Sequence, residues 1–296
     1  MAVPLPRRRF MAALPAALLP SLGRAAGIDA VLRGTLERAY IGWAEAMKRG
    51  DLAAFSRYTS RYRQLCLRNE VVSLGQPWPR AVFKGIVQAP SLTGLTCLDA
   101  AEHGETARLV YFGKVDFGLD GGTATENPVV LRFLRESDGW KFDWLQFVNL
   151  GKDDATRQSL RSGGRDWLNA PQFALSGTYP PIPKPCREPY QVAGISIIAN
   201  GCRVSVSINA GMHVESIEND SGGRVITGGL QKGLNPITIS PATLPGITAP
   251  SLQIAVLAKN GSASRVLWKW SPPDPPASWK PRYDTSIFIK SSAAVR

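Results

Sequence analysis

The chain has 296 residues, of which 44% are hydrophobic and 20% are charged, the composition of a globular protein with one or two domains. This composition excludes a mostly disordered chain and a collagen. A polytopic membrane protein is also excluded, since no apolar run reaches the roughly 18–20 residues that a spanning helix needs. The net charge is +12, but the lysines and arginines are scattered rather than gathered in a stripe, which argues against a nucleic-acid partner.

Residues 1–26 have the pattern of an export signal. Arg7, Arg8 and Arg9 precede a short apolar block at residues 10–19, and small residues suited to cleavage follow. The arginine run resembles the twin-arginine signal, and an ordinary secretory leader explains it equally well. A mitochondrial presequence fits less well, because the apolar block is compact. We therefore predict a periplasmic or secreted protein of the bacterial envelope, with no stable membrane insertion after the signal is removed.

Three helices are predicted at the start of the mature chain. Apolar residues recur at three- and four-residue steps over residues 28–49, the spacing of a helix that faces a core. Gly50 is expected to end this helix, and Asp51 to cap a second one over residues 52–58. A third helix is predicted over residues 61–71.

The periodicity then changes from helical to alternating, which predicts strands. Turn residues separate four of them, over residues 92–100, 107–117, 128–136 and 140–150. In the last strand Phe142 and Trp144 are expected on one face, and Lys141 and Asp143 on the other. Helices followed by an antiparallel meander predict an α+β domain at residues 27–151.

The opening of this domain carries a family resemblance. The segment Tyr40-Ile41-Gly42-Trp43-Ala44 leads through Gly50-Asp51 into the second helix, and a hairpin closes the domain at residues 129–150. This order resembles the nuclear-transport-factor-2-like superfamily, which includes SnoaL-like and ketosteroid-isomerase-like proteins, over about residues 30–150. The resemblance implies helices packed on a curved antiparallel sheet that together form a cone, often with an apolar pocket and often in a homodimer.

The second half of the chain has a different sequence pattern, with prolines and short strand-like runs. Residues 152–185 are predicted to form a helix and a proline-rich linker, and residues 272–296 a proline-rich tail. The last residues of this tail, 286–296, are expected to be either a loose end or a docked edge strand. The region between the linker and the tail, residues 186–271, predicts an all-β sandwich and resembles the immunoglobulin-like accessory domains of exported bacterial proteins. Its seven expected strands cover residues 192–199, 202–209, 213–218, 224–227, 236–239, 252–257 and 265–270.

Four cysteines follow the leader. In an oxidising compartment an even number permits disulfides, and sequence proximity favours the pairs Cys66–Cys97 and Cys186–Cys202. Two other pairings and four buried free thiols remain as alternatives. No C-x-x-C motif occurs, so neither a structural zinc site nor a thioredoxin-like redox site is predicted.

Motifs for common catalytic and cofactor chemistry are missing. The chain has two histidines, His103 and His213, and neither lies beside a nucleophile motif, so both are expected to be ordinary surface residues. No G-x-S-x-G, dinucleotide-binding or phosphate-loop pattern is found. We therefore predict no cofactor and no metal.

The interior of the implied cone is the remaining candidate site. Asp116 and Asp143 are the candidate catalytic carboxylates, because burial raises the pKa of a carboxyl group and makes it a base. Their alternation with Lys114 and Lys141 is the ordinary pattern of a solvated sheet face, and the sequence favours this interpretation over the catalytic one. The candidate pocket-lining residues, which are also typical of an ordinary core, are Tyr40, Trp43, Tyr111, Phe133 and Trp144.

These observations favour an exported, non-catalytic binding or interaction protein whose partner is a small apolar ligand or an envelope protein. The alternative is an isomerase or dehydratase acting on a small apolar substrate in the cone. A third hypothesis, a glycan adhesin that uses the sandwich, rests on Trp268 and Trp270, which alternate with Lys269 and are expected to face the sandwich core.

Overall fold

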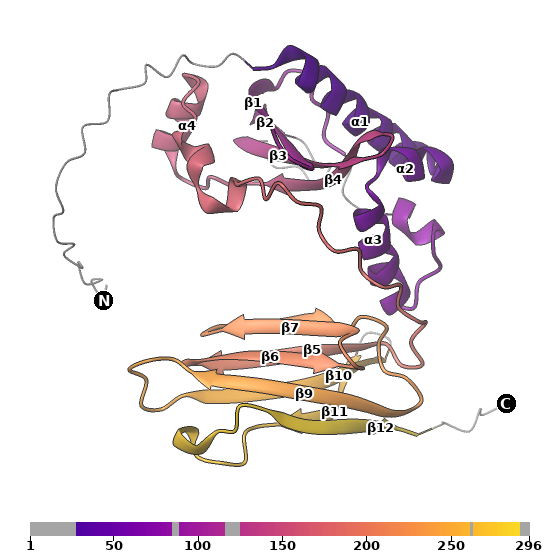
Figure 1. Cartoon of the computed structure of the whole chain (residues 1–296), viewed down its shortest axis with the longest axis vertical. Helices are drawn as coiled ribbons and strands as arrows, with labels where there is room; N and C mark the ends of the chain where they lie inside the picture. Colours follow the sequence, from indigo (N-terminus) through magenta and orange to yellow (C-terminus); the bar gives the residue numbers. More distant parts are fainter. Residues whose placement is uncertain (1–27, 85–88, 116–124, 261–262, 291–296) are drawn as a thin grey trace.

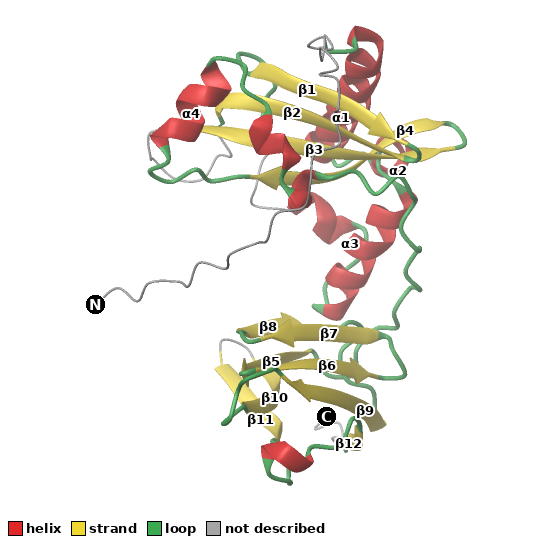
Figure 2. Cartoon of the chain, turned by 60° about the vertical axis from the view of Figure 1, so that its left-hand side comes forward, coloured by secondary structure: helices red, strands yellow, loops and turns green. Residues whose placement is uncertain are grey.

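A computed structural model describes residues 28–84, 89–115, 125–260 and 263–290. The N-terminal part holds helices and one antiparallel sheet, and the C-terminal part is all β (Figures 1 and 2). This order of a helix-plus-sheet unit and an all-β unit confirms the coarse prediction from sequence. Within the described ranges, no helix is both long and apolar enough to cross a membrane.

The three expected helices form, although the first begins at residue 30 rather than 28 and the third ends at residue 73 rather than 71. They are α1 (Ala30–Arg49), α2 (Leu52–Tyr58) and α3 (Arg61–Ser73). Gly50 ends α1 in the left-handed conformation, with φ of 67°, and Asp51 caps α2 by accepting from the Ala54 N–H at 3.0 Å. Ser60 caps α3 in the same way, its Oγ accepting from the Arg63 N–H at 3.0 Å.

The sheet of the N-terminal part is an antiparallel meander. Its strands lie in the order β1 (Thr96–His103), β2 (Thr106–Lys114), β3 (Glu126–Glu136) and β4 (Gly139–Phe147). On one face, Leu36 and Tyr40 of α1 share a core with Leu109 and Leu131. The other face is covered by α4 (Asp154–Arg161) and the 3₁₀ turns after it, which supply apolar side chains including Leu160, Leu168 and Phe173. The sheet is therefore covered on both sides.

The expectation of a solvated face at Lys141 is wrong. Its side chain is buried, with 6% of its surface exposed. The Nζ atom donates to the carbonyl oxygen of Arg57 and to the carboxylate of Asp138, each at 2.6 Å. A buried ammonium group is tolerated here because both contacts compensate for the water it has lost.

A β-bulge in β4 changes which side chains share a face. Arg132 pairs with Trp144 and Phe133 with Phe142, so Asp143 is the extra residue between them. The backbone N–H of Ser60 donates to the Phe142 carbonyl at 2.8 Å, which docks the start of α3 against the bulge. Phe142 is therefore buried and Trp144 is 44% exposed. The prediction that these two residues share a face is wrong, since it assumed unbroken alternation.

The C-terminal part consists of two four-stranded sheets that share one apolar core. One sheet has the order β11-β10-β5-β8 and the other β12-β9-β6-β7. Their bounds are β5 (Ala193–Asn200), β6 (Cys202–Ile208), β7 (His213–Glu218), β8 (Ser221–Val225), β9 (Gly233–Thr243), β10 (Ser251–Asn260), β11 (Ala263–Trp270) and β12 (Tyr283–Ile289). The last strand was expected only as one of two alternatives, and it pairs with β9, so this part extends beyond residue 271. Trp268 and Trp270 pack against the core as expected.

Helix α3 joins the two parts (Figure 1). The side chain of Asn69 donates to the carbonyl of Lys184 at 2.9 Å and accepts from the backbone N–H of Cys186 at 2.8 Å. The hydroxyl of Ser73 accepts from the Gly228 N–H at 2.7 Å, in the loop between β8 and β9. Asn69 and Ser73 are both buried, so these bonds are shielded from water.

Both expected disulfides, Cys66–Cys97 and Cys186–Cys202, are absent, and all four thiols are free. Cys97 lies on β1 at one edge of the sheet, whereas the helix that carries Cys66 contacts β4 at the other edge. Cys186 lies at the junction, 3.8 Å from the Ser73 hydroxyl, and Cys202 lies in the core of the all-β part. Sequence proximity therefore did not bring either pair together.

Candidate functional site

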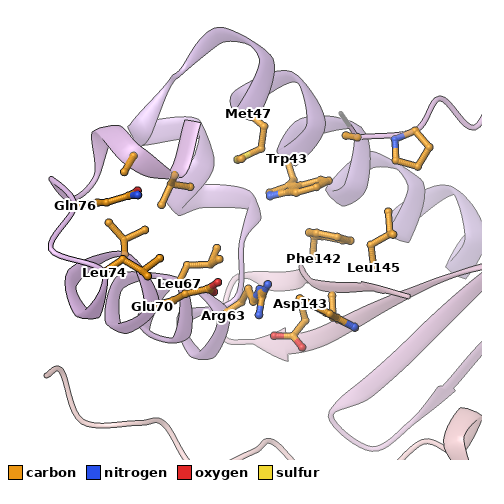
Figure 3. Close-up of a pocket in the computed structure, with 16 residues that line it drawn as sticks. Trp43, Met47, Arg63, Leu67, Glu70, Leu74, Gln76, Phe142, Asp143 and Leu145 are labelled. Atoms are coloured by element: carbon orange, nitrogen blue, oxygen red, sulfur yellow. The ribbon is translucent and has the colours of Figure 1, made fainter. Parts of the chain in front are cut away.

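A cavity of about 420 Å³ lies between α1, α3, the 3₁₀ turn Arg80–Lys84 and β4 (Figure 3). Its volume falls in the range of small-molecule sites. Most of its lining is apolar and includes Trp43, Met47, Leu67, Leu74, Phe142, Trp144 and Leu145. A few polar groups, including Arg63, Glu70 and Asp143, interrupt this lining. The cavity thus combines an apolar surface with a few charges, as ligand sites commonly do.

The residues predicted to form the site divide into three groups. Trp43, Asp143 and Trp144 line the cavity. Tyr40, Tyr111 and Phe133 are almost fully buried in the core between α1 and the sheet and do not line it. The hydroxyl of Tyr40 donates to the Pro90 carbonyl at 2.7 Å, and that of Tyr111 donates to Glu37. Asp116 lies outside the described residues.

One wall of the cavity was missed from sequence. It is formed by α3, which contributes Arg63, Leu67, Glu70 and Leu74. These residues follow one another at steps of four, three and four, so they lie on a single face of the helix. This spacing was visible in the sequence, but the mixture of charged and apolar residues on the face did not mark it as a core-facing stripe.

Arg63 is the cation of the cavity. Its guanidinium carbon lies 4.1 Å from the centre of the Trp144 ring, the geometry of a cation–π contact. Burial lowers the pKa of Arg63, although an arginine remains protonated in any protein environment. Among the described residues, its side chain makes no hydrogen bond and no ion pair. The charge is therefore held by stacking, and its N–H donors lack a protein acceptor within the described ranges.

Asp143 occupies the floor of the cavity. Its Oδ1 accepts a hydrogen bond of 2.5 Å from Ser60 Oγ. In Figure 3 its carboxylate points away from Trp43 and Met47. Burial raises the pKa of Asp143, against the opposing effects of the Ser60 hydrogen bond and of Arg63 and Arg132 nearby. The carboxylate thus fastens the bulge to α3, and its proton-accepting oxygen is directed away from the apolar lining.

A second cavity, of about 1020 Å³, lies where α3 meets the C-terminal part. Arg63, Glu70, Leu74 and Trp144 line both cavities, and we call the second one the junction cleft. Its other lining residues mix polar and apolar side chains, and the titratable or charged ones include Lys184, His213, Glu215 and Arg224. The apolar cavity and the junction cleft are therefore neighbours that share these four side chains.

His213 is not the surface residue that the sequence predicted. It is 5% exposed, and its Nδ1 accepts from the Thr227 N–H at 3.3 Å. The Nε2 atom is buried without a hydrogen-bond partner in the structure. Burial lowers the pKa of His213. The other histidine, His103, is exposed as expected, with its Nδ1 3.3 Å from the Leu175 carbonyl.

Within the described residues, no group of three or more His, Cys, Asp or Glu side chains is arranged to hold a metal ion. Comparisons with known proteins supply no further assignment: no family model matches the chain, and neither a curated protein nor a solved structure does.

Proposed function

We propose that this protein is an exported, non-catalytic binding protein that holds a small, largely apolar molecule in the cavity between α1, α3 and β4. The observation that carries the proposal is the cavity itself, since about 420 Å³ of space is lined mainly by Trp, Phe, Leu and Met side chains. Burial of an apolar ligand there would remove its surface from water, which supplies the binding free energy. The helices and sheet would form the cone of a nuclear-transport-factor-2-like domain, and the all-β part an immunoglobulin-like accessory domain.

Catalysis is the second candidate, because burial raises the pKa of Asp143 as a general base requires. The contact with Ser60 argues against this role. A general base must lie within hydrogen-bond reach of the proton it removes. The Asp143 Oδ1 atom is already occupied by the Ser60 hydroxyl, and in Figure 3 the carboxylate points away from Trp43. Binding without turnover is the function that this geometry favours.

The proposed compartment rests on residues 1–26 of the sequence. We expect protein purified from its own host to have a denatured mass that lacks this segment. Retention of the complete leader in the purified protein would contradict export with cleavage. The native mass of the same sample reports whether the protein is a dimer, as the family resemblance implies, and whether it retains a ligand.

Ligand binding in the cavity is tested with a neutral apolar fluorophore, N-phenyl-1-naphthylamine, and two alanine substitutions. Ala81 lines the cavity, so Ala81→Phe fills part of it, whereas Ala53 is exposed on α2 and Ala53→Phe is the matched control. We expect the wild type and Ala53→Phe to bind the fluorophore with equal affinity, and Ala81→Phe to bind about tenfold more weakly or worse. Equal binding by all three proteins, or no binding by the wild type, would overturn the proposal.

A further inference from the structure

The four residues shared by the two cavities differ in character, and this difference suggests what the ligand looks like. Leu74 and Trp144 continue the apolar lining of the first cavity, while Arg63 and Glu70 bring charge to the boundary with the junction cleft. A molecule that passes from one cavity to the other would thus meet an apolar wall first and charged groups next. An apolar cavity that leads to a charged boundary suits an amphiphile, which has an apolar body and a polar head.

The charges around the boundary are unequal. In the junction cleft, Glu215 is paired with Arg224 at 3.1 Å, so these two residues compensate each other. In the lining of the junction cleft, that leaves Arg63 and Lys184 as cations and Glu70 as the single carboxylate, and none of these three side chains forms an ion pair within the described ranges. Asp143, which lines the apolar cavity, is a further carboxylate whose charge acts on Arg63, and its Oδ1 is already bonded to Ser60. The residual positive charge therefore lies on the junction-cleft side of Arg63, which favours an anionic head group there.

The stacking of Arg63 on Trp144 makes this residue the better anchor for an anion. A guanidinium whose carbon lies over a ring, and whose N–H groups have no protein acceptor within the described ranges, keeps these donors available, and they form a fork that matches a carboxylate, sulfate or phosphate. Donors that are partly desolvated and lack an acceptor carry a free-energy cost, and an anionic ligand would remove it. Trp144 also reduces the freedom of the side chain, so less conformational entropy is lost on binding.

We propose that the ligand is an amphiphile with an anionic head group, whose apolar body fills the cavity between α1, α3 and β4 and whose head binds Arg63 at the boundary with the junction cleft. This inference rests on the proposed binding function and adds the chemical class of the ligand. Lys184, at the exposed end of the linker, strengthens the attraction at longer range. Glu70 opposes it, because its carboxylate lies on the same face of α3, two turns after Arg63.

The probes are three molecules with the same ten-carbon chain: decanoate, decanol and decyltrimethylammonium, used below the concentrations at which they form micelles and measured by titration calorimetry. The wild type should bind decanoate about tenfold more tightly than decanol, and decyltrimethylammonium most weakly. Arg63→Met should weaken decanoate binding by about tenfold and change decanol binding little. The control is Arg203→Met, which removes the same charge from an exposed position on β6.

Glu70→Gln is expected to bind decanoate several-fold more tightly than the wild type, since the opposing carboxylate is gone. A misfolded variant would lose decanoate binding, so a gain of affinity cannot be explained by misfolding. The inference is overturned if the wild type binds decanol as tightly as decanoate, or if Arg63→Met and Arg203→Met affect decanoate equally. Those results leave the proposed function intact as long as the neutral fluorophore binds and Ala81→Phe blocks it.

Discussion

The hydroxyl of Ser60 links Asp143 in the bulge of β4 to the first turn of α3. It donates to the Asp143 carboxylate at 2.5 Å and accepts from the backbone N–H of Arg63 at 3.0 Å. Ser60 is completely buried, so water cannot replace either bond. Because α3 supplies one wall of the cavity and β4 another, this hydroxyl sets the distance between the two walls.

Ser60→Ala should therefore lower the free energy of unfolding by about 1–3 kcal/mol, since it removes the helix cap and leaves the buried Asp143 carboxylate without its donor. Asp143→Asn should cost less at neutral pH. The asparagine oxygen still accepts from Ser60. The substitution also removes a buried negative charge, and burial of this charge is what raises the pKa of Asp143. Urea unfolding of both variants and the wild type measures this. A larger loss from Asp143→Asn than from Ser60→Ala would contradict it.

The raised pKa of Asp143 also predicts a pH dependence. Since folding favours the protonated carboxyl, the stability contributed by this group is fully present below its ordinary pKa of 3.8 and is lost as the pH rises through the higher pKa of the folded state. The wild type should therefore lose stability relative to Asp143→Asn as the pH rises above about 4. Denaturant unfolding at several pH values measures the difference in free energy of unfolding between the two proteins. A difference that does not change with pH would contradict a raised pKa of Asp143.

The opposite sign is expected for His213. Burial, the largest cause, and the nearby Arg224 lower its pKa, while Glu215 opposes them. A histidine that folding keeps neutral contributes stability above its ordinary pKa of 6.5, and this stability is lost as the pH falls toward the folded-state value. As the pH falls below 6.5, the wild type should lose more stability than His213→Gln. His103→Gln, which makes the same substitution at the exposed histidine, serves as the control.

Asn69 is expected to hold the two parts of the molecule together. In Asn69→Ala, the Lys184 carbonyl and the Cys186 N–H lose their partners, and we expect a loss of about 2–4 kcal/mol together with faster hydrogen exchange at Cys186. Asn149→Ala is the matched control. Among the described residues, its side chain is hydrogen-bonded only to the Gly151 N–H, at an exposed turn, and its loss should stay within about 0.5 kcal/mol. Similar losses in both variants would show that the Asn69 contacts do not secure the junction.

Local chemistry made the helices predictable. Asp51 and Gly50 act at the helix ends as their residue types suggested, because capping depends on neighbours in sequence. The site was less predictable, because the bulge at Asp143 depends on Ser60, which is 83 residues away in the chain. One inserted residue reverses the face of every side chain that follows, which is why Trp144 lies apart from Phe142. The strand β12 follows a proline-rich stretch that obscured it.

The free thiols lead to a last prediction, which reconciles them with the proposed export. Cys186 and Cys202 are buried, and burial raises the pKa of Cys66, Cys97 and Cys202, which reduces the fraction of reactive thiolate. Thiols shielded in this way can persist in an oxidising compartment. The denatured mass should show no deficit of hydrogen, and iodoacetamide should label all four cysteines in denaturant but react only slowly with the folded protein. A mass lower by four hydrogens would instead establish two disulfides. It would also require Cys97 to leave the sheet edge opposite to the one that α3 contacts.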